Sequence, residues 1–269
     1  MKTKFLSIMV LAACMMMAAC GDNQKKNDQT AEDESGEKVM TAEDATADAE
    51  AVVDEEDYEI PHRGIETIRK VWADKSLTVD GDKSKVGIKE LMKAFSGAYP
   101  QCETNEALRR YFADKDAAGK DEFSLEIEQK ESNYPTRYDI TCNARNGFIR
   151  SMGWVETDRC TYGCFWNRKN GHKLFAAYME ECWESASWDQ CLVVFYDYDP
   201  ATGTMTPEPE LTNMIEKRAK GYTCYYLDLP EEGKDIQMTV VDDHGNDMDE
   251  DWTEESFVLK WDGQSFGWK

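Results

Sequence analysis

Apolar residues recur along this chain with two different spacings. Before about residue 120 they fall every three or four positions, in stripes at 65–72, 88–95 and 108–112. That spacing places the apolar side chains of each stripe on one face of a helix, so the pattern predicts three short helices. Gly97 and Pro100 follow the second stripe and are expected to end its helix.

From about residue 121 the spacing changes to two residues, which predicts strands. Phe123, Leu125 and Ile127 alternate with polar residues, and further runs follow with turn residues between them. These expected strands lie at 138–144, 148–156, 163–167, 173–181, 192–198, 204–206, 222–229, 236–241, 257–261 and 265–268.

Asn-Gly and Asp-Gly pairs separate several of these runs, at 146–147, 170–171 and 262–263. Such pairs suit the positive φ angles of tight hairpins, and consecutive hairpins form an antiparallel meander. The sequence therefore predicts an α+β fold, with N-terminal helices packed on a mainly antiparallel β-meander. A β-sandwich or a partial propeller is the alternative, because about ten strands tend to curl or to split into two layers.

The first 20 residues have the pattern of an export signal. Two lysines precede an apolar run at 5–17, and the small residues Ala18 and Ala19 lead to Cys20. The run is too short, and wrongly flanked, for a membrane-spanning helix. Residues 1–19 are therefore predicted to be a cleaved signal peptide.

The run 17–20 (Met-Ala-Ala-Cys) resembles the lipobox of bacterial lipoproteins. The resemblance implies that the thiol of Cys20 carries lipid and that the mature protein is tethered to a membrane through it. The run 11–14 (Leu-Ala-Ala-Cys) fits the same pattern, but cleavage there would leave apolar residues on the mature protein. Gly21 rather than Asp follows Cys20, which fits sorting to the outer membrane. The expected location is the cell envelope. A simple cleaved signal with a chance cysteine is the alternative.

Acidic residues dominate the next segment. Residues 20–59 hold 15 Asp and Glu against three Lys, and they have too little apolar surface to offset the entropy of ordering. We predict a disordered, lipid-anchored linker at 20–59 and a single globular α+β domain at 60–269. The formal net charge of the chain is −23, which argues against a nucleic-acid partner because such partners are bound mainly through Lys and Arg.

Three segments of the predicted domain, 165–172, 195–203 and 259–263, look like hairpins of uncharacterised exported lipoproteins of the Bacteroidetes type. The resemblance extends over part of the domain only. It implies no known activity and therefore assigns no functional residue.

Seven cysteines lie in the predicted domain, and export permits disulfides among them. Cys182 closes one expected strand and Cys191 opens the next, so a hairpin would bring them within the range of a disulfide. A zinc site of these two with Cys160 and Cys164 is the alternative. Its second pair, however, has eight intervening residues where zinc sites usually have two to four.

The loop between Cys182 and Cys191 carries the candidate binding residues Trp183, Trp188 and Asp189. Indole rings offer flat apolar surface with one hydrogen-bond donor, which suits sugar rings or the hot spot of a partner protein. We predict that this loop contacts a glycan or an envelope protein. The alternative is that both tryptophans fold back and cap the sheet.

Motifs for catalysis are missing from the sequence: it has no G-x-S-x-G elbow, no HExxH pair and no phosphate-binding loop. The predicted domain has 39 acidic residues, too many to single out a pair for glycoside hydrolysis. Calcium is the one cofactor left open, through the carboxylate-rich run 242–251. The run 80–84 begins like an EF-hand loop, but Lys85 stands where glycine is required.

These observations assign no catalytic and no metal-ligating residue. The leading prediction is a non-enzymatic, lipid-anchored binding or accessory protein of the cell envelope. The alternative is an envelope hydrolase that uses carboxylates or a bound metal.

Overall fold

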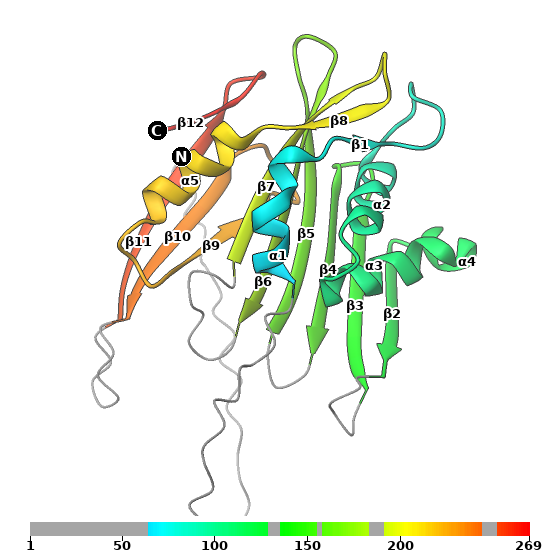
Figure 1. Ribbon diagram of the computed structural model, residues 1–269, viewed down its shortest axis with the longest axis horizontal. Helices are drawn as coiled ribbons and strands as arrows, with labels where there is room; N and C mark the ends of the chain where they lie inside the picture. Colours follow the sequence, from blue (N-terminus) through cyan, green and yellow to red (C-terminus); the bar gives the residue numbers. More distant parts are fainter. Residues whose placement is uncertain (1–63, 129–134, 155–157, 183–190, 244–251) are drawn as a thin grey trace, which may run out of the picture. The chain divides into compact units, whose positions relative to one another are not determined.

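The computed structural model describes residues 64–128, 135–154, 158–182, 191–243 and 252–269. All of them belong to one unit of the chain, Asp57–Lys269, while the other unit, Met1–Glu56, lies outside the described residues. The helices are α1 (Ile65–Val71), α2 (Ile88–Ala98), α3 (Glu103–Ala113), α4 (Lys115–Ala118) and α5 (Pro209–Ala219), with a 3-10 turn at Trp72–Asp74 (Figure 1). The strands are β1 (Leu77–Thr78), β2 (Glu122–Ile127), β3 (Thr136–Asn143), β4 (Phe148–Trp154), β5 (Asp158–Asn167), β6 (Lys173–Cys182), β7 (Cys191–Asp199), β8 (Thr204–Pro207), β9 (Cys224–Asp228), β10 (Ile236–Asp243), β11 (Trp252–Trp261) and β12 (Phe266–Trp268).

The local predictions are confirmed, except that α2 continues through Gly97 and ends at Ala98, shortly before Pro100. The three apolar stripes form α1 with the 3-10 turn, α2 and α3, and the expected strands are present as β2 to β12. The predicted turns are also present, because Gly147, Gly171 and Gly263 have φ angles of 73°, 87° and 95°, in the left-handed region that favours glycine. The sequence reasoning did not predict β1, α4 or α5.

Among the described residues the strands form two sheets. The larger sheet has eight strands in the order β1-β8-β7-β6-β5-β4-β3-β2, and the smaller has four in the order β12-β11-β10-β9. Neighbouring strands are antiparallel in both sheets. Strands β2 to β8 follow one another in chain order, so that this part of the larger sheet is a meander.

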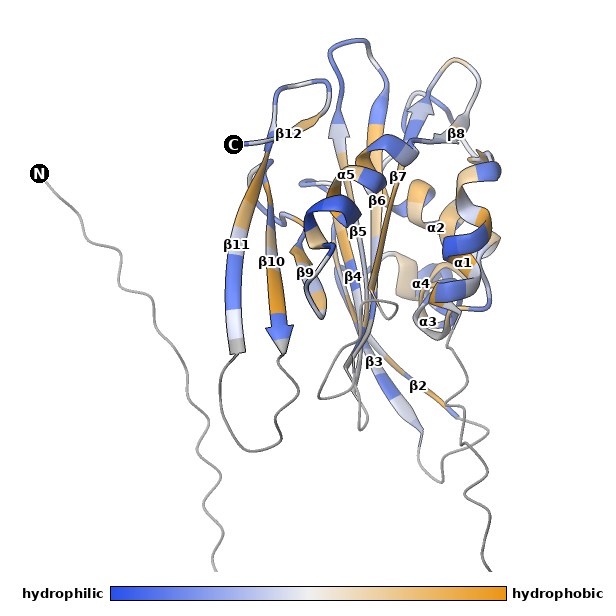
Figure 2. Ribbon diagram, turned by 60° about the vertical axis from the view of Figure 1, so that its left-hand side comes forward, coloured by the Kyte–Doolittle hydropathy of each residue, from blue (hydrophilic) through white to orange (hydrophobic). Residues whose placement is uncertain are grey.

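The predicted fold class is wrong. The described chain is mostly antiparallel strand in two sheets with few helices, and not a set of helices packed on one meander. Helices α1 to α4 lie on one side of the larger sheet and the smaller sheet lies on the other (Figure 2). The physical reason is that the central strands are apolar on both faces, so both faces need cover.

Strand β6 illustrates this two-sided burial. Its side chains at 175, 177 and 179 belong to the core beneath the helices. Those at 174, 176 and 178 belong to a second core, which the larger sheet shares with β9 to β12 and α5. A continuous apolar run of this kind is typical of a strand that is covered on both faces.

Helix α5 covers one margin of the second core. Leu211, Ile215 and Ala219 recur on its buried face, the spacing expected of an amphipathic helix. Its opposite face carries exposed basic residues beside β11. The helix and that strand form the walls of the candidate site.

Candidate functional site

A groove of about 550 Å³ runs between α5 and the margin of the smaller sheet. Strand β11 forms one wall of the groove. Side chains alternate between the two faces of a strand, so Phe257 and Leu259 lie on the same face. Leu259 is buried in the core, whereas Phe257 is only half-buried. Trp268 of β12 pairs in register with Leu259 and therefore shares that face. The groove is lined by Met214, Lys217, Arg218, Tyr222, Glu255, Phe257 and Trp268.

Arg218 lies over two aromatic rings of this groove. Its guanidinium carbon is 4.5 Å from the ring centroid of Phe257 and 4.8 Å from that of Trp268, within the range of cation–π attraction. The two rings meet edge to face, with centroids 6.0 Å apart. Apolar ring surface and a delocalised cation are thus presented together at the surface.

Tyr222 and Glu255 form a polar pair in the same groove. The tyrosine hydroxyl donates a hydrogen bond of 2.6 Å to the Glu255 carboxylate. This bond raises the pKa of Tyr222, because deprotonation would place two negative charges side by side. The hydroxyl therefore remains a donor at neutral pH, and it occupies one oxygen of the carboxylate.

A second hollow of about 480 Å³ adjoins the first and shares Lys217 and Tyr222 with it. Glu216 lines this hollow. Burial raises the pKa of Glu216, while the nearby guanidinium of Arg69 from α1 acts in the opposite direction. Arg69 forms an ion pair with Glu216 and also donates to the backbone carbonyl of Cys191, so the helix is tied to α1 and β7 at this end.

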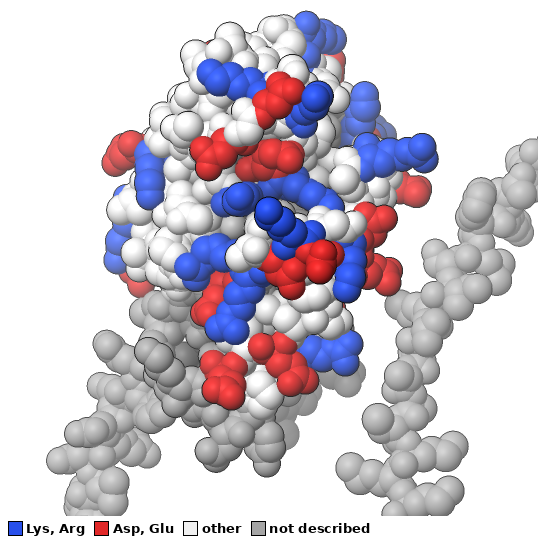
Figure 3. Space-filling model, turned by 90° about the vertical axis from the view of Figure 1, so that its right-hand side faces the viewer, with Lys and Arg blue, Asp and Glu red and all other residues white. Residues whose placement is uncertain are grey.

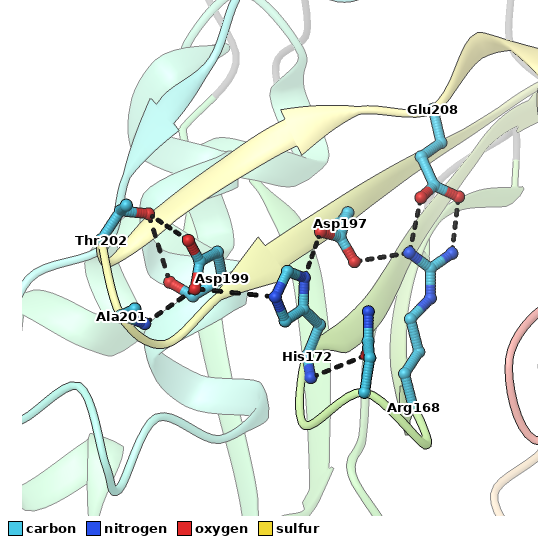
Figure 4. Close-up of polar contacts among 8 residues, drawn as sticks. Arg168, His172, Asp197, Asp199, Ala201, Thr202 and Glu208 are labelled. Carbon is cyan, nitrogen blue, oxygen red and sulfur yellow. Dashed lines mark hydrogen bonds and ion pairs between the residues drawn. The ribbon is translucent and has the colours of Figure 1, made fainter.

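A buried arginine, Arg168, holds the N-terminal end of α5 in place (Figure 4). Arg168, in the turn between β5 and β6, donates hydrogen bonds of 2.5 and 2.6 Å to the two carboxylate oxygens of Glu208. It also donates a hydrogen bond of 2.5 Å to the carboxylate of Asp197 in β7. Glu208 immediately precedes the helix, so the network positions the first turn of α5 against the larger sheet.

His172 extends this network but does not form a catalytic triad within the described residues. Its Nδ1 lies 2.6 Å from Asp197 and its Nε2 lies 3.7 Å from Asp199 (Figure 4). Both ring nitrogens therefore face carboxylates, and no described hydroxyl or thiol hydrogen-bonds to the ring. A nucleophilic mechanism needs such a group next to the base, and so the network is best described as a structural clamp.

The structure does not describe the residues that the sequence predicts for lipidation and binding. Cys20, Trp183, Trp188 and Asp189 lie outside the described residues, as do residues 244–251 of the calcium candidate. Among the described histidines, cysteines, aspartates and glutamates, no group of three or more could hold a metal ion. In the part of the chain that the structure describes, no helix is both long and apolar enough to cross a membrane.

The predicted Cys182–Cys191 disulfide stays a prediction. Cys191 is a buried free thiol, and its backbone pairs in register with Glu180. Cys182 ends β6, but its side chain lies outside the described residues. The described cysteines are not joined to one another by any disulfide.

The sequence reasoning missed the groove. Its residues come from α5, the turn after it, β11 and β12, and they meet only in the folded chain. A usable signal was present, because Pro209 can begin a helix and apolar residues at 211 and 215 are followed by basic residues at 217, 218 and 220.

On one face of the molecule, basic side chains have acidic neighbours. Figure 3 shows the face on the side of α4 and β2, where Lys and Arg gather across the middle with Asp and Glu directly beside them. This face therefore offers no uninterrupted basic surface of the kind that phosphate backbones require.

Comparison with protein families, with curated proteins and with solved structures finds no match to this chain.

Proposed function

We propose that this protein is a lipid-anchored, non-enzymatic protein of the cell envelope that binds a glycan in the groove between α5 and β11. The lipobox at Cys20 and the acidic segment that follows it support the anchor and the location. The groove supports the binding role. The single observation that carries the proposal is the pair of half-buried rings, Phe257 and Trp268, that line the groove beside hydrogen-bonding side chains.

The composition of the groove suits a sugar. Ligand sites typically have volumes of about 300–1,000 Å³ and combine apolar walls with a few polar groups, as this groove does. A sugar ring has one face of C–H groups that packs on an aromatic ring, and hydroxyl groups at its rim.

Truncation of the rings tests this proposal. Trp268→Ala and Phe257→Ala are expected to weaken the binding of envelope oligosaccharides by about tenfold or more, the magnitude of a lost aromatic contact at a binding site. Val258→Ala is the matched control, because Val258 is on the opposite face of the same strand. The expected result is loss of binding in the two ring variants and unchanged binding in the control. Equal binding by all three variants would contradict the proposal.

A hydrolase is the second candidate, and one observation favours it. Glu216 lines the second hollow and has a raised pKa, a property of carboxyl groups that act as general acids. The test is to incubate the protein with the oligosaccharides that it binds. Release of products by the wild type, abolished in Glu216→Gln without loss of binding, would favour the hydrolase over the binding protein.

A further inference from the structure

The basic residues of the groove lie in an otherwise acidic part of the chain. Residues 191–243 contain 11 Asp and Glu but only four Lys and Arg. Three of these four, Lys217, Arg218 and Lys220, line the two hollows, and the fourth, Lys234, does not. Positive charge in this segment is therefore concentrated at the groove.

Glu255 lines the groove and Glu216 lines the adjoining hollow, but neither forms an ion pair with these cations. Glu255 accepts the hydrogen bond of Tyr222, and Glu216 pairs with Arg69. Among the described residues, no ion pair joins any of the three groove cations to a carboxylate. An anion that enters the groove therefore meets cations that form no ion pair with a described carboxylate.

Arg218 is placed to hold a carboxylate next to an aromatic surface. No hydrogen bond connects its guanidinium to another described residue, although it lies over Phe257 and Trp268. A guanidinium can donate two parallel hydrogen bonds to one carboxylate. Phe257 and Trp268 are only half-buried, so the ring surface that the guanidinium does not cover is open to the C–H face of the sugar that bears that carboxylate.

We infer that the groove binds acidic oligosaccharides, with a sugar carboxylate held by Arg218 and the sugar ring packed against Phe257 and Trp268. This inference rests on the proposed function, since it names the class of glycan for the same groove. An acidic peptide shares the carboxylates but lacks the flat C–H face that the two aromatic rings match, so the geometry favours the sugar.

Isothermal titration calorimetry with three probes tests the charge requirement. The full-length protein in detergent is titrated with tetragalacturonate, with its fully methyl-esterified form, and with tetraglutamate. The ester keeps the sugar rings and removes the charge, whereas the peptide keeps the charge and removes the rings. Tetragalacturonate is expected to bind at least about tenfold more tightly than either, the magnitude of a hydrogen-bonded charged contact, and to bind less tightly as salt is added.

Substitution of Arg218 tests the residue. Arg218→Gln is expected to lower the affinity for tetragalacturonate by about tenfold or more and to leave the affinity for the ester unchanged. Arg218→Lys keeps the charge but not the two-pronged geometry, so it is expected to give an intermediate loss. Lys234→Gln is the matched control, because it makes the same charge change in the same segment outside the groove. Thermal unfolding of each variant checks that the fold is retained.

The outcomes separate this inference from the proposed function. If acid and ester bind equally and both depend on Trp268, the acidic class is overturned and the glycan groove stands. If tetraglutamate binds as tightly as tetragalacturonate, the partner is an acidic protein segment and the sugar assignment is overturned. If neither saccharide binds, the proposed function falls together with the inference.

Discussion

Arg168 holds Glu208 through two parallel hydrogen bonds, one from each terminal nitrogen of its guanidinium. The arginine lies in the β5–β6 turn and the glutamate immediately precedes α5, so this pair fixes where the helix begins. Because α5 is one wall of the groove, the geometry of the site depends on a contact made at the end of the larger sheet.

Removal of this contact is expected to lower stability. Glu208→Gln leaves the buried Arg168 with only Asp197 as an ionised partner, and we expect the free energy of unfolding to fall by about 1–3 kcal/mol. Glu210→Gln removes an exposed acid from the first turn of the helix that Glu208 precedes, and it is expected to cost less than about 1 kcal/mol. Urea unfolding measures both, and equal losses would show that the Arg168–Glu208 pair does not stabilise the fold.

Local structure was predictable from this sequence, whereas the assembly of the layers was not. Spacing and turn residues identify the strands because period and φ preference are properties of a few neighbouring residues. The run Leu174–Met179 predicts a strand, and its lack of alternation indicates burial on both faces. The run does not show which elements cover the second face of the sheet, because that depends on contacts between segments far apart in the chain.

The groove was beyond the reach of sequence reasoning for the same reason. Arg218 and Phe257 are separated by 38 intervening residues, and neither belongs to a motif with fixed spacing. Their contact arises because α5 and β11 both close the margin of the second core. The sequence identified candidate tryptophans in the loop 183–190 instead, and that loop lies outside the described residues.

The β11–β12 turn, which positions Trp268, is expected to weaken in acid. Asp262 accepts hydrogen bonds from the backbone N–H groups of Ser265 and Gln264, and these bonds lower its pKa in the folded state. Such a group stabilises the fold above its unfolded pKa, and this contribution is lost as the pH falls through the folded pKa. Wild type should therefore be more stable than Asp262→Asn at neutral pH, with the difference vanishing on acidification. A pH-independent difference in thermal unfolding would contradict this role of the charge.

Removal of Arg69 is expected to shift the titration of Glu216. Burial raises the pKa of this carboxyl group and the guanidinium of Arg69 holds it down, so Arg69→Met should raise it further. Lys70→Met is the control, because Lys70 pairs with Glu66 at the surface. NMR titration of the side-chain carboxyl carbon gives the pKa in each variant. An unchanged or lower pKa in Arg69→Met would show that the pair does not control this group.

Cys20 is expected to carry the lipid. Cells grown with radiolabelled palmitate should label the wild type and Cys14→Ser but not Cys20→Ser, because only Cys20 is placed where cleavage removes the whole apolar run. Cys20→Ser should also leave the membrane fraction, since the acyl chains supply the membrane affinity. If labelling were lost in Cys14→Ser and kept in Cys20→Ser, the lipid would be on Cys14 and this prediction would be wrong.

The most direct test of the glycan groove follows the indole N–H signals of the protein by NMR while envelope oligosaccharides are added. Trp268 lines the groove, whereas Trp166 is buried in the second core and donates its N–H to the backbone of Lys234 at 2.9 Å. The predicted result is a saturable shift of the Trp268 signal with that of Trp166 unchanged. A Trp268 signal that stays in place while the protein binds the oligosaccharides would contradict the assignment of the groove as the binding site.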